Sequence, residues 1–120
     1  MDKEIQEALA KAKAINEENA RLSSEFHGNF AYVKSYQDAC LAFPDFDKND
    51  IISFFKILES AVVDINAVNN LVLAGRDNFI DNVKKKTSST LLSQGLYKKL
   101  NLKNNFNSLL SKLFVNLQLY

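Results

Sequence analysis

The most concentrated charge in this sequence is a set of lysines in its C-terminal third. Positive side chains gathered in one region bind phosphate groups or acidic protein surfaces. No arginine or exposed aromatic residue accompanies them to read bases, so any DNA contact would be non-specific. We expect phosphate or acidic-partner contact from Lys84, Lys85, Lys86, Lys98, Lys99 and Lys103. The competing interpretation is a solvated helix face.

The overall charge balance hides an asymmetry along the chain. The net charge is +1, but residues 1–75 carry 7 basic and 12 acidic side chains, whereas residues 76–120 carry 8 basic and 2 acidic ones. Such a division indicates either an acidic or nucleic-acid partner for the basic third, or attraction between two halves of one fold. Both interpretations stay open at this point.

Residues that could support catalysis are few. The only histidine, His27, and the only cysteine, Cys40, are too far apart in sequence to form a zinc motif. We expect Cys40 to be a small buried hydrophobic residue, and His27 to be exposed or to cap a helix end. The three glycines are too widely spaced for a phosphate-binding loop.

A nuclease-like pair of carboxylates, Asp45 and Glu59, follows Pro44, but such sites need a lysine two residues after the glutamate. Ala61 stands at that position. We therefore predict no catalytic residue, metal, cofactor or small-molecule substrate in this chain, and a function in binding.

The elements that hold these residues are predicted to be helices. From about Lys3 to Phe26, apolar side chains recur in heptad steps and form one stripe with an asparagine in it. The stripe consists of Ile5, Ala8, Ala12, Ile15, Asn19, Leu22 and Phe26. His27 and Gly28 are expected to end this helix, and Asn29 to cap the next one.

Further helices follow from the same three- and four-residue steps. The second is expected to run from Phe30 to about Phe43, to end at Pro44, and to carry Phe30, Val33, Tyr36 or Gln37, Cys40 and Phe43 on one side. The third, capped by Asp47 or Asn49, should be central and continue to Gly75 with Val68 and Val72 in its apolar face.

A fourth helix is expected around Phe79 to Leu91, with its Thr87–Thr90 segment frayed or bent and a break at Gly95. The last helix should begin near Asn104. The sequence thus predicts one domain over residues 1–120, an all-α compact bundle of four to five amphipathic helices. No apolar run is long enough to cross a bilayer and no signal core is present, so we expect a cytoplasmic protein.

Three segments resemble the C-terminal region of the restriction (R) subunit of type I restriction-modification enzymes. They are LSSEFHGNFAYVKSYQ (22–37), AVNNLVLAGRDNF (67–79) and LYKKLNLKNNFNSLLSKLFVNL (96–117). The first contains a helix ending in glycine and a polar residue, followed by a helix that opens with an aromatic and a basic residue. Together the segments span most of the chain, and none contains a catalytic residue.

The resemblance implies that the chain is a C-terminal fragment of an ATP-dependent type I site-specific deoxyribonuclease. It also implies a helical assembly domain that docks the motor subunit on the methyltransferase and specificity subunits, close to DNA. The alternative is a free-standing helical interaction or regulatory protein that dimerises through the stripe from Ile5 to Phe26. That alternative predicts a stripe without a partner inside its own chain.

Overall fold

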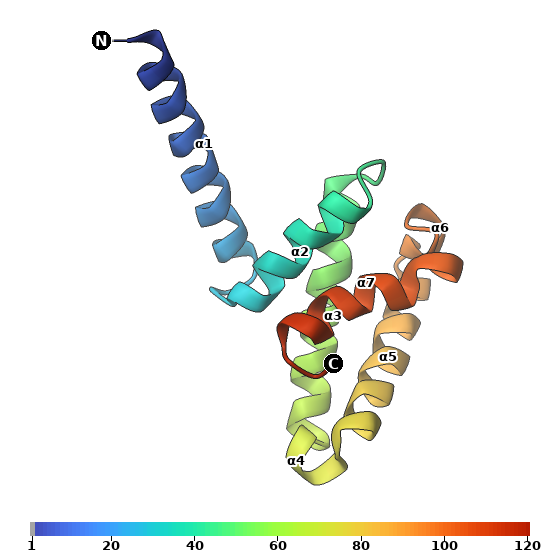
Figure 1. Ribbon diagram of the computed structural model, residues 1–120. Coiled ribbons are helices and arrows are strands. Elements are labelled where there is room, and N and C mark those ends of the chain that lie inside the picture. The colour runs from blue at the N-terminus through green and yellow to red at the C-terminus, as the bar shows by residue number, and fades with distance from the viewer. Residues whose placement is uncertain (1) are drawn as a thin grey trace.

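The computed structural model describes residues 2–120, and over this range the chain is an all-α bundle (Figure 1). Five helices have 13 or more residues, and two have only four, which confirms the predicted fold class. In chain order they are α1 (Lys3–Glu25), α2 (Phe30–Ala42), α3 (Lys48–Val68), α4 (Leu71–Ala74), α5 (Arg76–Ser93), α6 (Leu96–Lys99) and α7 (Leu102–Asn116).

The core lies where α2, α3, α5 and α7 pack together. Helix α3 packs against α2 on one side and α5 on another, and α7 crosses α2 (Figure 1). The predicted central position of α3 is confirmed. Burying each large apolar side chain stabilises the fold by about 1.5–3 kcal/mol. The largest fully buried side chains include Phe54, Phe55, Leu58, Leu91, Leu109 and Phe114.

The predicted helix ends are mostly confirmed. Asn29 and Asp47 cap α2 and α3, their side chains accepting hydrogen bonds from the backbone N–H of Ala31 (3.1 Å) and Asn49 (2.7 Å). After α1, the backbone N–H of Gly28 donates to the carbonyl of Ser23 at 2.7 Å, which closes the last turn.

The third helix is shorter than predicted. It ends at Val68, and Asn70 starts the separate turn α4 by accepting a hydrogen bond from Leu73 N–H at 3.0 Å. An asparagine that caps a helix competes with continuation of the preceding helix. Val68 and Val72 are consequently exposed at the tip of the bundle, so their predicted core positions are wrong.

Helix α2 is rotated relative to its predicted face. Val33 and Tyr36 are buried as predicted, but Phe30 is 72% exposed, because the arc that α2 turns toward α3 and α7 is shifted from the predicted face. The arc consists of Tyr32, Val33, Ser35, Tyr36 and Ala39. Cys40 is half-buried against the core rather than fully buried.

The C-terminal helices also differ in detail from the prediction. Helix α5 continues through Thr87–Thr90 without a break, and the Thr90 hydroxyl donates to the carbonyl of Lys86 at 3.1 Å. Gly95 does end α5, adopting φ 72°, and the extra turn α6 follows before α7 begins at Leu102.

Helix α1 leaves the packed body and projects from it (Figure 1). The principal extents of the molecule are 59 × 32 × 21 Å and its radius of gyration is 16.6 Å. A fully compact chain of this length would have a radius of gyration of about 14 Å. The difference reflects the projecting helix.

Candidate interaction surface on helix α1

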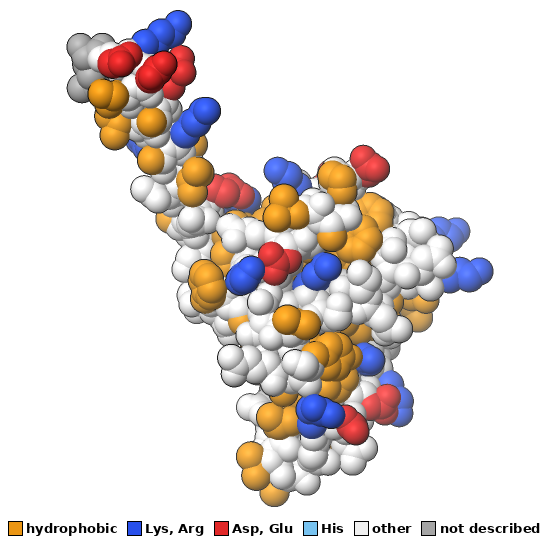
Figure 2. Space-filling model, viewed as in Figure 1, with side chains coloured by type: hydrophobic (Ala, Val, Ile, Leu, Met, Phe, Trp, Pro, Cys, Tyr) orange, Lys and Arg blue, Asp and Glu red, His pale blue; other side chains and the backbone are white. Residues whose placement is uncertain are grey.

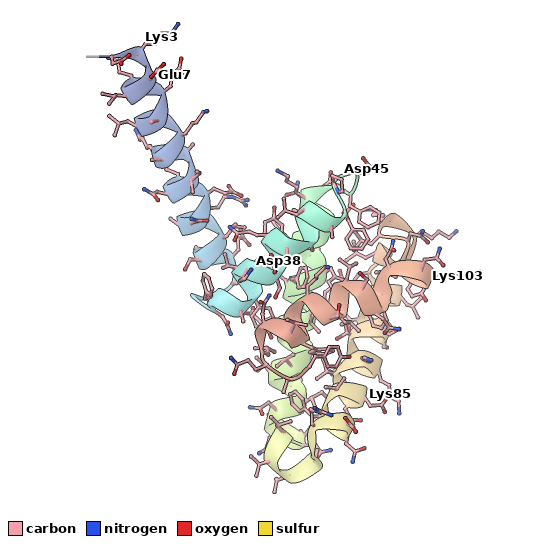
Figure 3. All side chains as sticks on the ribbon, in the orientation of Figure 1. Lys3, Glu7, Asp38, Asp45, Lys85 and Lys103 are labelled. Atoms are coloured by element: carbon pink, nitrogen blue, oxygen red, sulfur yellow. The ribbon has the colours of Figure 1, made fainter. Side chains whose placement is uncertain are left out.

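The part of α1 outside the body, residues 3–21, is called the arm below. Every residue from Asp2 to Arg21 is exposed. Figure 3 places Lys3 and Glu7 at the end of the arm, far from the rest of the chain. In proteins, most of the stability of a helix comes from packing of its apolar face, and the apolar face of the arm is not packed. A partner that packed against the apolar face of the arm would therefore stabilise this part of the helix.

The apolar stripe of α1 is buried at one end and uncovered at the other. Leu22 and Phe26 are 1% and 0% exposed, whereas Ile15 is 59% exposed. The Asn19 side-chain oxygen accepts a hydrogen bond from Gln37 Nε2 of α2 at 3.0 Å, so the stripe faces α2. Hydrophobic and charged side chains share the surface of the arm (Figure 2). The face that packs at the root of the arm thus continues into solvent without cover.

A groove of about 630 Å³ opens where α1 and α2 diverge. Its surface is mostly apolar, and Leu41 is 82% exposed. Burial raises the pKa of Tyr36 to about 12, and the neighbouring Cys40 adds to the rise. The groove is lined by Glu18, Leu22, Tyr36, Gln37, Cys40, Leu41, Pro44 and Lys48. The sequence periodicity does not reveal this groove, because it depends on the angle between the two helices.

Contacts at the root fix the direction of the arm. The Phe26 ring stacks on Tyr32 with centroids 6.1 Å apart. Lys56 Nζ of α3 lies 2.6 Å from Glu25 Oε2, and this hydrogen bond holds the pKa of Glu25 below its usual value. Within α1 itself, Arg21 lies 2.8 Å from Glu18, and this hydrogen bond lowers the pKa of Glu18.

The turn between α1 and α2 is fastened to α3 by the only histidine. His27 adopts φ 55°, its ring is 78% exposed, and Nδ1 lies 3.0 Å from Glu59 Oε1. Burial, and secondarily the charge of Glu59, raises the pKa of Tyr32 at the same place. A cavity of about 590 Å³ with Lys56 and Ser60 on its wall opens here. This histidine is exposed, as predicted, and joins two elements.

The six predicted lysines fall into two groups. Lys85 and Lys86 lie near Asp81 (3.0 Å) and Asp64 (3.6 Å), and Lys84 is half-buried. The other three, Lys98, Lys99 and Lys103, are exposed where α6 meets α7. Figure 3 shows Lys85 and Lys103 well separated on the same side of the view.

Ion pairs between the acidic part of the chain, residues 1–75, and the basic part, residues 76–120, neutralise few of the charged side chains. Among the ion pairs of the described residues, only Lys86 with Asp64 joins residues 1–75 to residues 76–120. The cluster at α6 and α7 is therefore a surface of positive charge and is the part of the lysine set best able to meet an anionic partner.

Within residues 2–120, no three or more His, Cys, Asp and Glu side chains are grouped so that they could hold a metal ion. Nor is any helix in this range long and apolar enough to traverse a bilayer. A scan of known protein families finds no match to this chain, and neither curated proteins nor solved structures yield a significant one. The resemblance to the restriction subunit stays a prediction.

Proposed function

We propose that this chain is a non-catalytic helical assembly module, and that the arm of α1 provides its binding face. The observation that carries the proposal is the half-covered stripe: Leu22 and Phe26 are buried in the body, while Ile5 and Ile15 are 52% and 59% exposed. A partner helix that continued the packing would bury these side chains and stabilise the arm.

Two kinds of partner are compatible with this function. In the setting that the resemblance implies, the arm would dock on the methyltransferase and specificity subunits of a type I restriction enzyme. In a free-standing interaction protein, the partner would be another copy of the chain. The uncovered stripe is what the second alternative anticipates.

Hydrogen exchange of the full-length protein tests the proposal. We expect amides of residues 3–21 to exchange rapidly in dilute protein, and slowly either at high protein concentration or with a purified methyltransferase–specificity core. Association should protect the arm because it completes the packing of its apolar face. Rapid exchange of the arm under both conditions would contradict the assembly function.

Two variants that add the same charge test whether the stripe, rather than another face of the arm, forms the contact. Ile15→Asp should remove the protection, because it places a charge in the contact face. Ala10→Asp adds the same charge on the opposite face of the helix and should leave protection unchanged. Both residues are exposed, so neither change should affect the stability of the body.

A further inference from the structure

We propose that the arm packs antiparallel against the arm of a second copy of this chain, with the groove between α1 and α2 receiving the amino-terminal end of the other arm. This inference rests on the proposed function and adds the identity and direction of the partner helix. The position of α2, the pattern of small residues and the charges beside the stripe all support it.

The position of α2 disfavours a parallel pair. At Asn19 the stripe already lies beside α2, since Gln37 donates to the Asn19 side chain at 3.0 Å. In a parallel pair, equivalent levels of both stripes would face each other, and the two α2 helices would compete for the same space. In an antiparallel pair, each body lies beside the free end of the other arm, so the conflict disappears.

The stripe fits an antiparallel alignment in which Ile15 faces Ala12 of the second copy. Asn19 then lies opposite Ala8, and Leu22 opposite Ile5. The contact from Ile5 to Leu22 is about 27 Å long at 1.5 Å per residue. Alanine opposite Asn19 leaves room for the bond to Gln37, whereas parallel dimers commonly pair two asparagines at such a position.

Charges beside the stripe complement each other in the same alignment. One edge of the stripe carries Glu4, Lys11, Glu18 and Glu25, and in an antiparallel pair this edge meets its own copy. Lys11 then lies opposite Glu18 of the second copy, twice by symmetry, beside the Arg21 side chain that contacts Glu18 within its own helix at 2.8 Å. Glu4 falls opposite Glu25, whose charge Lys56 compensates at 2.6 Å.

A parallel pair would bring that charged edge against the other edge of the stripe. The other edge consists of the uncharged residues Leu9, Asn16 and Ser23, so no ion pair would form. Charge complementarity therefore selects the antiparallel direction.

The groove between α1 and α2 lies where the amino-terminal end of the second copy's arm would pack. Ile5 of the second copy reaches the level of Leu22, whose own side chain is already buried, and there meets the exposed Leu41 of α2, which lines the groove. Each groove thus covers the most remote apolar side chain of the other arm. The resulting assembly contains α1 and α2 of both copies as four neighbouring helices.

Sedimentation of the full chain gives the first test. We expect a dimer with a dissociation constant below about 100 μM, as interfaces of ordinary size provide. Lys11→Glu and Glu18→Lys should each weaken the dimer about tenfold, since each places like charges together twice. An equimolar mixture of the two variants should regain wild-type affinity, because both contacts then join Glu to Lys.

Disulfide crosslinking in a Cys40→Ser background tests the direction. A mixture of the Ala8→Cys and Asn19→Cys chains should crosslink between the two species, while each alone should not. In an antiparallel pair, identical positions at residue 8 lie about 16 Å apart along the axis. Crosslinking of Ala8→Cys with itself would indicate a parallel pair and overturn the proposal.

The outcomes separate this proposal from the assembly function. A monomer at 100 μM whose arm becomes protected only with the methyltransferase–specificity core would overturn the second-copy proposal and leave the assembly function standing. An arm that no condition protects would overturn both.

Discussion

Of two buried hydroxyl groups in this bundle, one has hydrogen-bond partners and the other has none among the described residues. Ser35 Oγ accepts a hydrogen bond from Asn116 Nδ2 of α7 at 3.0 Å, and its single proton lies between the carbonyl oxygens of Ala31 (2.5 Å) and Lys112 (3.1 Å), so it joins α2 to α7. Thr87 Oγ1 is buried in α5 with no hydrogen-bond partner among the described residues. A buried polar atom without a partner costs about 1–3 kcal/mol.

We therefore expect Thr87→Val, which keeps the side-chain shape, to raise the free energy of unfolding by about 1 kcal/mol. Ser35→Ala should lower it by about 1 kcal/mol, because it removes satisfied bonds between two helices. Urea unfolding followed by circular dichroism would measure both. A loss of stability in Thr87→Val would mean that its hydroxyl finds a partner in solution.

The ion pair of Glu25 with Lys56 predicts that the stability of the fold decreases at acid pH. The pKa of Glu25 in the fold lies below its usual 4.5, chiefly because Lys56 donates a hydrogen bond to it. The stabilisation by this pair is present above that usual value and is lost as the pH falls through the lowered pKa. We expect the melting temperature of the wild type to fall more between about pH 5 and 3 than that of Glu25→Gln. Equal slopes would show that the pair is too solvated to matter.

At the scale of elements, the turn from α4 to α5 depends on Gly75. Its φ of 81° with ψ of 156° is a conformation that only glycine adopts readily, whereas Gly95 has φ 72° and ψ 15°, which asparagine also tolerates. Gly75→Asn should therefore lower the free energy of unfolding by about 1–3 kcal/mol. The matched change Gly95→Asn should cost less than about 1 kcal/mol. If thermal unfolding shows a larger loss of stability for Gly95→Asn than for Gly75→Asn, this explanation of Gly75 is wrong.

At the scale of the whole molecule, the exposed Lys98, Lys99 and Lys103 at the junction of α6 and α7 form no ion pair among the described residues, and we propose that non-specific DNA contact occurs only there. Three phosphate contacts by Lys98, Lys99 and Lys103 would weaken binding about 40-fold between 50 and 200 mM salt. Replacing these lysines by glutamine should abolish a gel shift at low salt. Replacing Lys85 and Lys86, which lie near Asp81 and Asp64, should change it little. No shift by the wild type at micromolar protein would remove the DNA proposal.

The sequence by itself determined the helices and most of their ends. Local rules set these features: apolar residues in three- and four-residue steps, caps at Asn29 and Asp47, and breaks at Gly28 and Pro44. The same periodicity identified the stripe of α1, and residue types alone identified the lysines as the candidate phosphate contacts. The predictions of the helices and their ends hold because helix formation depends on neighbours within about one turn, whereas the role of the lysines stays a prediction.

Only the tertiary structure decided which apolar faces are covered. Leu22 and Ile15 belong to one stripe, yet the first is buried where α1 packs against α2 and nothing within residues 2–120 buries the second. Phe30 and Val72 likewise match the pattern of core residues and are exposed. Burial, ion pairing of the lysines and the groove beside α1 depend on the angles between helices. Those angles result from packing across the whole core, which the local pattern does not encode.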